Sequence, residues 1–165
     1  MNKTKIEWTE WTWNPVVGCQ RGCHYCYARK IFQRFHKSNK FTDVRLYPER
    51  LEQPLRIKKY PKNCWLGITV TSNRDWGQAV RLVKVKRDNL KFISIEPILG
   101  KIDTSYFSLC DWVILGGLTP KPIHKQQWIK DFLYNNRKLN LPIFMKNNLN
   151  WRGKLRQEFP IICRE

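Results

Sequence analysis

The chain has 165 residues, with 31 Lys and Arg against 13 Asp and Glu, so its formal net charge is +18. This length indicates a single domain, 1–165, and excludes a complete eight-fold β/α barrel, which takes about 250 residues. Hydrophobic residues make up 42% and aromatic residues 13%, which excludes a disordered basic tail. The sequence contains no run of 18 apolar residues, and its first residues lack the apolar core of a signal peptide. We therefore expect a cytoplasmic protein with no membrane partner.

The positive charge gathers at the two ends of the sequence. The net charge is +9 for residues 1–62, +2 for residues 63–120 and +7 for residues 121–165. A basic field raises the local concentration of polyanions, of which nucleic acid is the commonest. We therefore predict DNA or RNA as a partner, with an ordinary solvated lysine-rich surface as the alternative interpretation.

Short apolar strands alternate with helices along the chain. In chain order, the pattern predicts a strand at 13–17, a helix at 27–35, a strand at 65–70, a helix at 76–85, strands at 92–95 and 112–115, a helix at 125–136 and a strand at 143–145. The helix at 76–85 is expected to be capped by Asn73 or Asp75. Alternation of this kind is typical of an α/β fold with a parallel sheet. Five strands suffice for a truncated parallel (β/α) partial barrel.

The residues just past the predicted strands differ in character from the strands themselves. Ligand sites of parallel sheets lie beyond the carboxyl ends of the strands. Polar or small residues stand at those positions: Thr71, Asn73, Glu96, Gly116, Gly117 and Lys146. The sequence therefore predicts a binding site along this edge of the sheet.

Residues 18–27, GCQRGCHYCY, hold three cysteines in a C-x3-C-x2-C spacing between a predicted strand and a predicted helix. Three thiolates on one loop can face a single metal centre and leave one iron of a four-iron cluster open to a small molecule. We therefore predict Cys19, Cys23 and Cys26 as ligands of a [4Fe-4S] cluster. A zinc site is the alternative and would need a fourth ligand, for which the sequence offers His36, Cys64, Cys110 and Cys163. Disulfides are disfavoured because cytosolic thiols stay reduced.

The three-cysteine loop resembles the cluster-binding signature of the radical S-adenosylmethionine (SAM) superfamily. The similarity extends further, to a phage-associated three-cysteine-motif family of uncharacterised radical-SAM-like proteins, through the stretches IEWTEWTWNPVVGC, CYARK, YPERLEQPL, NCWLGITV, FISIEPILGKID, DWVILGG, LPIFMKN and LRQEFP. This resemblance implies a partial barrel of the radical SAM type. It also implies a [4Fe-4S] cluster whose open iron is chelated by SAM, and reductive cleavage of SAM to a 5′-deoxyadenosyl radical.

The resemblance further implies where SAM would lie. Tyr25, the aromatic residue before the last cysteine, would sit against the adenine, and SAM would extend across the strand ends. Asn73 could reach the ribose, and Gly116 and Gly117 could allow close approach of the methionine end. The remaining positions of this predicted cofactor-binding set are Thr71, Glu96 and Lys146. No catalytic residue is assigned.

Each strand-end residue also has a plainer interpretation. Glu96 is expected to bind SAM or substrate, and the alternative is a carboxylate neutralised by a Lys or Arg in the same layer. Lys146 is expected to bind a phosphate or carboxylate, and its alternative is a solvated basic surface. Asn73 could instead cap a helix, and the two glycines could form a simple turn.

Two features depart from the family pattern. Only residues 56–62 join YPERLEQPL to NCWLGITV, where relatives carry roughly two further β/α units, so a six-strand partial barrel is reduced to about four or five strands. The Gly-Gly pair is followed by Leu118-Thr119-Pro120, where relatives tend to have an acidic residue and then a glycine-rich loop. Both a compact enzyme and a degenerate copy that keeps only the cluster fit these departures.

We therefore expect an iron–sulfur radical SAM enzyme that modifies or repairs a nucleic acid, with its electron supplied by a flavodoxin-like or ferredoxin-like donor. The alternative is a non-catalytic nucleic-acid-binding protein with a structural iron–sulfur or zinc site. A third hypothesis is an assembly subunit, such as a homo-oligomer, whose missing barrel units come from a partner or a second copy.

Overall fold

A computed structural model of the chain describes residues 2–3, 5, 10–12, 23–36, 65–77, 80, 82, 89–105 and 107–161. The chain divides into two compact units, Met1–Lys59 and Tyr60–Glu165. The expectation of one continuous domain stays a prediction, and the two units are taken one at a time.

The first unit holds two short strands and one helix. Strand β1 (Asn2–Lys3) pairs antiparallel with strand β2 (Trp11–Thr12), and helix α1 spans Tyr27–His36. The helix predicted at 27–35 is therefore confirmed to within one residue. The strand predicted at 13–17 lies outside the described residues.

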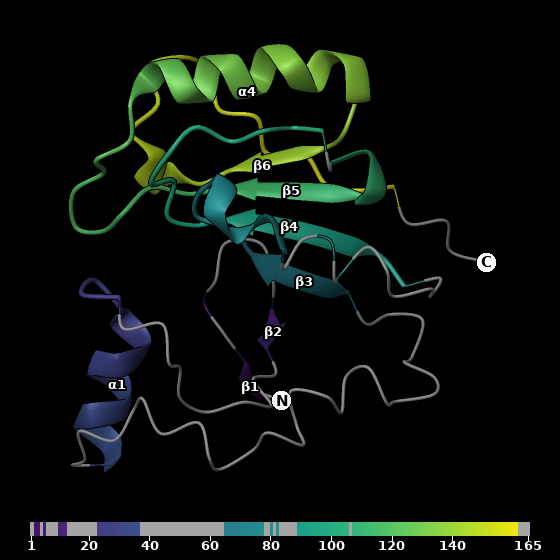
Figure 1. Ribbon diagram of the computed structural model, residues 1–165. Coiled ribbons are helices and arrows are strands. Elements are labelled where there is room, and N and C mark those ends of the chain that lie inside the picture. Colours follow the sequence, from purple (N-terminus) through teal and green to yellow (C-terminus); the bar gives the residue numbers. More distant parts are fainter. Residues whose placement is uncertain are drawn as a thin grey trace. The chain divides into compact units, whose positions relative to one another are not determined.

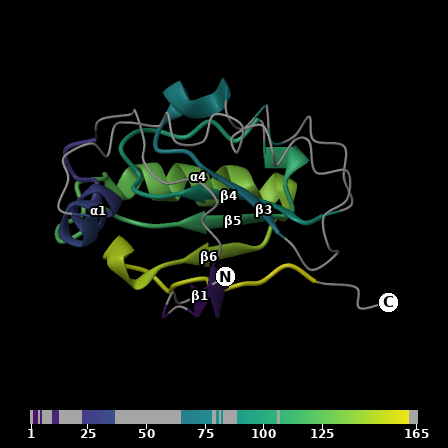
Figure 2. The same cartoon turned by 90° about the horizontal axis from the view of Figure 1, so that it is seen from below.

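The second unit is built on a four-stranded parallel sheet (Figures 1 and 2). Its strands, in spatial order, are β3 (Leu66–Thr69), β4 (Lys91–Ile95), β5 (Trp112–Leu115) and β6 (Ile143–Met145). The predicted α/β class and four of the predicted strands are confirmed, and the bounds of β5 and β6 are those expected. The partial barrel itself stays a prediction.

Strands β5 and β6 are covered on both faces. All four residues of β5 and all three of β6 are buried, the pattern that parallel sheets show when both of their faces are covered. Residues 156–158 cover the outer edge of β6, where the Met145 N–H donates to the Arg156 carbonyl at 2.7 Å and the Glu158 N–H to the Ile143 carbonyl at 2.9 Å. This edge of the sheet is thereby protected from further strand pairing.

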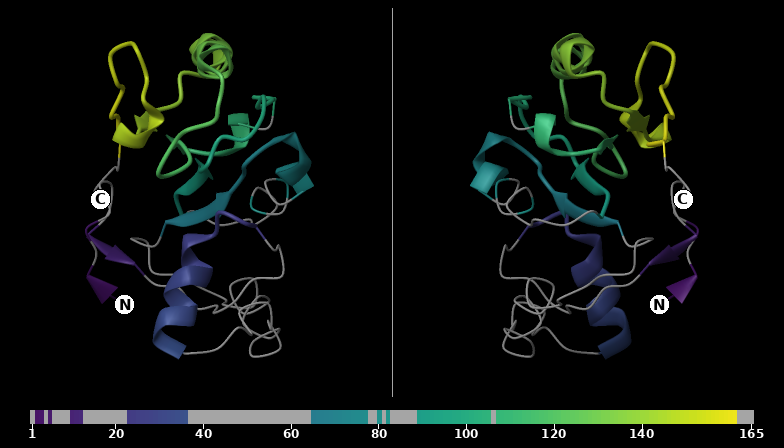
Figure 3. Two further views of the ribbon diagram at one scale, coloured as in Figure 1. Left: turned by 90° about the vertical axis from the view of Figure 1, so that its left-hand side faces the viewer. Right: turned by 90° about the vertical axis from the view of Figure 1, so that its right-hand side faces the viewer.

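Helix α4 (Gln126–Leu139) lies across one face of the sheet, and Figure 3 shows it nearly end-on. Its buried residues Ile129 and Phe132 join the core. The predicted end at residue 136 is wrong by three residues. Asn136 is buried and its side-chain amide donates to the Leu141 carbonyl at 2.9 Å, so this asparagine secures the turn after the helix. The helix ends at Asn140, which takes the left-handed conformation with φ 50°.

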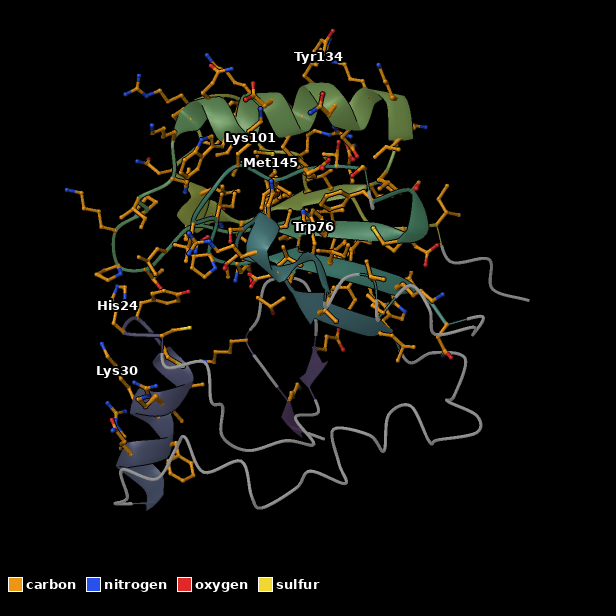
Figure 4. The ribbon with its side chains drawn as sticks, in the orientation of Figure 1. His24, Lys30, Trp76, Lys101, Tyr134 and Met145 are labelled. Carbon is orange, nitrogen blue, oxygen red and sulfur yellow. The ribbon has the colours of Figure 1, made fainter. Side chains whose placement is uncertain are left out.

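The segment after β3 begins with a 3-10 turn, η3 (Asn73–Asp75), and the described positions 76, 77, 80 and 82 that follow it are helical. Ser72 is the N-cap residue of the 3-10 turn, and the helical positions begin at residue 76, directly after Asp75. The expectation that Asn73 or Asp75 caps the helix stays a prediction. Trp76 leads into the core, 5.3 Å from the ring of Phe107 and perpendicular to it (Figure 4). Two more 3-10 turns are η4 (Phe107–Leu109) and η5 (Asn147–Leu149).

In the part of the chain that the structure describes, no helix combines the length and the apolar character that crossing a membrane requires.

Candidate functional site

The carboxyl ends of the four parallel strands of the second unit lie together along one side of the sheet, which is called the strand edge below. Thr71 follows β3, Glu96 follows β4, Gly116 and Gly117 follow β5, and Lys146 follows β6. Backbone hydrogen bonds tie the segments together there. The Lys146 N–H donates to the Leu115 carbonyl at 2.9 Å, and the Leu99 N–H to the Thr71 carbonyl at 2.9 Å. The strand-end residues singled out in the sequence are thus arranged along one edge.

Glu96 and Lys146 form an ion pair across this edge. Glu96 Oε1 lies 3.0 Å from Lys146 Nζ, and the side chains are 25% and 20% exposed, respectively. The other oxygen, Glu96 Oε2, accepts a hydrogen bond from the Ser94 hydroxyl at 3.2 Å. Oε1 itself is buried and accepts no aligned hydrogen bond from the described residues, so its contact with Lys146 is purely ionic. The alternative interpretation of Glu96, a carboxylate neutralised by a lysine of the same layer, therefore describes its observed state.

Residue 116 is a glycine because the Glu96 side chain occupies the space that a Cβ atom would need. A Cβ atom at residue 116 would come within 2.5 Å of Glu96 Oε1 and 2.8 Å of its Cγ. Any larger residue would push the carboxyl group out of its position beside Lys146. The glycine directly after β5 thus permits the pairing of a residue after β4 with a residue after β6.

Gly117 is held by the side chain of Asn148, a residue that the sequence reasoning missed. The Gly117 N–H donates to Asn148 Oδ1 at 3.1 Å, and Asn148 Nδ2 donates to the Gly117 carbonyl at 2.9 Å. A Cβ atom on Gly117 would collide with the Asn148 backbone carbonyl and approach the His124 ring. Asn148 follows the predicted strand 143–145 by only three residues, and this position was the only signal in the sequence that could have singled it out.

His124 packs beside the hydrogen-bonded pair of Gly117 and Asn148. Burial lowers the pKa of its imidazole from the ordinary 6.5, and a hydrogen bond with the backbone of Leu149 partly opposes that shift. Its Nδ1 atom is buried and has no hydrogen-bond partner among the described residues. Burial therefore favours the neutral form of this ring, which lies close to the loop that follows β5.

The polar side chains of Thr71 and Asn73, after β3, form hydrogen bonds with other groups of the protein. Thr71 is 4% exposed, and both its N–H and its hydroxyl donate to Asp75 Oδ2 at 2.7 Å. Asn73 Oδ1 accepts two hydrogen bonds, one from Trp76 Nε1 at 3.0 Å and one from the Asp103 N–H at 2.8 Å. The predicted roles of Thr71 and Asn73 in cofactor binding stay predictions, but both side chains already make these internal bonds.

The cysteine loop leads directly into α1. The Cys26 N–H donates to the Cys23 carbonyl at 3.2 Å, and the Cys26 carbonyl accepts from the Lys30 N–H at 3.5 Å, so Cys26 sits at the helix start. Both cysteines are free thiols and half-buried. Tyr25 lies between them, with its ring 5.0 Å from that of His24 (labelled in Figure 4). Cys19 lies outside the described residues. Within those residues, no group of three or more Cys, His, Asp or Glu is placed to hold a metal.

Cys110 is a poor candidate for a fourth zinc ligand. Its thiol is buried in the core, its Sγ donates to the Phe107 carbonyl at 3.3 Å, and burial raises its pKa to about 12. Metals bind the thiolate, which is suppressed by such an environment. Among the remaining candidates, Cys64 and Cys163 lie outside the described residues.

Comparison with known protein families gives one match. The model of a family described as "Protein of unknown function (DUF5131)" matches residues 3–62 and 56–159 of the chain. No curated protein and no solved structure matches. The two matched segments meet at residues 56–62, the short bridge at which the sequence departs from the expected pattern. Together they span both compact units, and the chain belongs to the DUF5131 family.

Proposed function

We propose that this protein is an iron–sulfur radical SAM enzyme that acts on a nucleic acid. The observation that carries the proposal is the cysteine loop. Its C-x3-C-x2-C spacing, and the position of Cys23 and Cys26 at the entrance to α1, are what a cluster with one open iron requires.

The described cysteines fit this cluster chemically. Thiolate sulfur is the donor that iron–sulfur clusters prefer. Cys23 and Cys26 are neither paired in a disulfide nor fully buried, and the hydrogen bond that joins them keeps both on one turn of backbone. Cys19, Cys23 and Cys26 would hold the cluster. When bound and reduced by a flavodoxin-like or ferredoxin-like donor, the cluster would supply one electron to SAM, giving methionine and a 5′-deoxyadenosyl radical that takes a hydrogen atom from the substrate.

The strand edge of the second unit supplies groups that suit a zwitterionic or anionic ligand. Lys146 would donate to a carboxylate or phosphate, while Glu96, whose buried Oε1 faces the Lys146 ammonium, would hold that ammonium in position. The ion pair holds both side chains in fixed positions before the ligand arrives. Asn148 would hold the Gly117 loop in place beside them. The proposed role of these residues is to bind and orient the ligand.

Positive charge supports the nucleic-acid part of the proposal. The chain carries a net charge of +18, and a field of this sign attracts polyanions. An alternative function is a non-catalytic nucleic-acid-binding protein whose iron–sulfur or zinc site is structural. The observation that favours this alternative is that Glu96 and Lys146 already neutralise each other, as a purely structural pair would.

Anaerobic reconstitution tests the proposal. The wild-type protein is expected to take up about four iron and four sulfide ions per chain and to form 5′-deoxyadenosine when reduced with SAM. Cys23→Ala is expected to lose both properties, whereas Cys110→Ala, which removes a buried thiol with no proposed role as ligand, is expected to keep them. Glu96→Gln should keep the cluster and lose SAM cleavage. Zinc as the only bound metal, or a full cluster that never cleaves SAM, would contradict the enzyme and support the alternative.

A further inference from the structure

A hollow is lined by one side of helix α4 and by Trp151. Seven residues line it, with a volume of about 400 Å³: Gln127, Lys130, Asp131, Leu133, Tyr134, Arg137 and Trp151. Six of them come from α4, mostly at the three- and four-residue spacing of one helix face. The seventh, Trp151, comes from the segment that follows η5. The hollow is therefore built from two separate parts of the second unit.

Two aromatic rings are available in this hollow. Tyr134 is 65% exposed and points away from the sheet (Figure 4). Trp151 is half-buried against the core, and its indole lies over Gly153, where a Cβ atom would come within 2.7 Å of Nε1. Gly153 thus leaves room for the indole ring. A large exposed tyrosine beside a positioned tryptophan offers flat surfaces on which a planar group can stack.

Cations surround these rings. The Arg137 guanidinium lies 5.7 Å from the centre of the Tyr134 ring, in cation–π contact. Lys130 lines the hollow, and the exposed Arg152 and Lys154 follow Trp151 in the chain. Asp131 is the acidic member of the lining, and it accepts a hydrogen bond from Gln127 at 2.8 Å. The balance around the hollow is positive.

We infer that this hollow binds single-stranded nucleic acid, with unpaired bases stacked on Tyr134 and Trp151 and the phosphates held by Lys130 and Arg137. Single strands suit it because their bases expose their faces, whereas a duplex buries them in its own stack. The inference rests on the proposed nucleic-acid substrate and specifies the surface that would hold it.

Two lining residues of the hollow, Gln127 and Trp151, directly follow residues that join the start of α4 to the end of η5. At the start of α4, the Gln126 side chain donates to the Asn150 carbonyl at 3.0 Å. Asn150 precedes Trp151 and follows η5, the turn that starts directly after Lys146. A strand held on α4 would therefore have a short path to the proposed ligand site, so α4 would serve as a substrate anchor beside the chemistry.

Binding of a fluorescein-labelled 15-mer of oligothymidylate, and in parallel of oligouridylate, tests the inference by anisotropy. Tyr134→Ala is expected to weaken binding roughly tenfold, because one lost stacking contact is worth that much, while Tyr134→Phe keeps the affinity. Arg137→Gln should lower the slope of log affinity against log salt by about 0.7. Asp131→Asn should strengthen binding. Lys101→Gln is the matched control for Arg137→Gln, because it removes the same charge from an exposed loop outside the hollow. It should leave the stacking of bases on Tyr134 and Trp151 intact.

The outcomes distinguish a failure of the proposed binding surface from a failure of the proposed enzyme activity. Cys23→Ala should bind both oligonucleotides as the wild type does, so loss of the cluster leaves this result unaffected. If the wild type binds but Tyr134→Ala and Arg137→Gln bind equally well, the hollow is not the binding surface. If an unlabelled duplex competes as well as a single strand, stacking is not the mode of binding. If the wild type binds neither oligonucleotide at low salt, both the hollow and the nucleic-acid substrate are wrong.

Discussion

The two ends of the strand edge use polar residues in opposite ways. After β3, the Asp75 carboxylate is 7% exposed and accepts two hydrogen bonds from Thr71 at 2.7 Å. After β4, the Glu96 side chain is 25% exposed, and one of its oxygens has only an ionic contact, to Lys146. One carboxylate is satisfied within its own loop. The other joins the residue after β4 to the residue after β6 through its ion pair.

The strand edge thus holds two kinds of carboxylate: Asp75, which is hydrogen-bonded within its loop, and Glu96, which we propose to take part in binding. Buried polar groups cost free energy unless they are hydrogen-bonded, so a fully bonded pair such as Thr71 and Asp75 is expected to stabilise its loop. The Glu96–Lys146 pair is only 25% and 20% exposed, so the cost of removing both charges from water offsets much of their attraction. We therefore propose that the pair serves ligand binding more than stability. The predictions below test this division, beginning with the largest expected effect.

Asp75→Ala should give the largest loss of stability. It removes the acceptor of two short bonds and leaves the buried N–H and hydroxyl of Thr71 without that partner. A loss of about 3 kcal/mol in the free energy of unfolding is expected, since each buried donor left unsatisfied costs about 1–3 kcal/mol. Urea titration followed by tryptophan fluorescence measures it. Lys146→Met, which removes the cation of the partly buried pair, is the comparison and should cost less, because the Glu96 side chain left behind is 25% exposed and can be hydrated. Equal losses for the two variants would remove the distinction between the two ends.

Gly116→Ala should have an intermediate effect. Its new methyl group would meet Glu96 Oε1 and Cγ at 2.5 and 2.8 Å, so the carboxyl group must move away from Lys146. Crowding of this kind costs about 1–3 kcal/mol. In a Glu96→Ala background the methyl group has space, and the same change should be neutral or stabilising by about 0.5 kcal/mol, because alanine restricts the unfolded chain. The double-mutant cycle measures this coupling. Additive effects would show that Gly116 is needed for another reason.

The second unit was largely predictable from its strands. The runs WVIL and IFM are short, continuous and apolar, which only a strand covered on both faces explains in an α/β pattern, and both were located to the residue. The end of α4 was not predictable, because Asn136 looks like a terminating residue. Its side chain instead bonds the Leu141 carbonyl from inside the helix, and that contact depends on how the following loop packs.

The sequence predicted which residues lie at the strand edge, but it did not predict which of them contact one another. Glu96, Gly116 and Lys146 could be chosen because parallel strands end together. That Gly116 is small to accommodate Glu96, and that Asn148 binds Gly117 through both its side-chain oxygen and nitrogen, depends on the order of strands in space. A single sequence does not contain that order. The Thr71 and Asp75 bonds failed to stand out for the opposite reason, since threonine and aspartate near a turn are common and carry no distinct signal.

The smallest expected effect is a dependence of stability on pH that comes from His124, which packs beside the β5 loop. Burial lowers the folded-state pKa of this imidazole below 6.5. The unfolded chain therefore binds a proton first as the pH falls, and stability rises with pH wherever the unfolded state holds more protons. The contribution of His124 is fully present above pH 6.5 and is lost as the pH falls from there through the folded pKa. His124→Gln should flatten the unfolding free energy over this range while leaving its value near pH 8 within about 1 kcal/mol. An unchanged slope in the variant would assign the pH dependence to another group. It would also mean that the ring beside Gly117 is hydrated, and that the loop after β5 is more open than its contact with Asn148 implies.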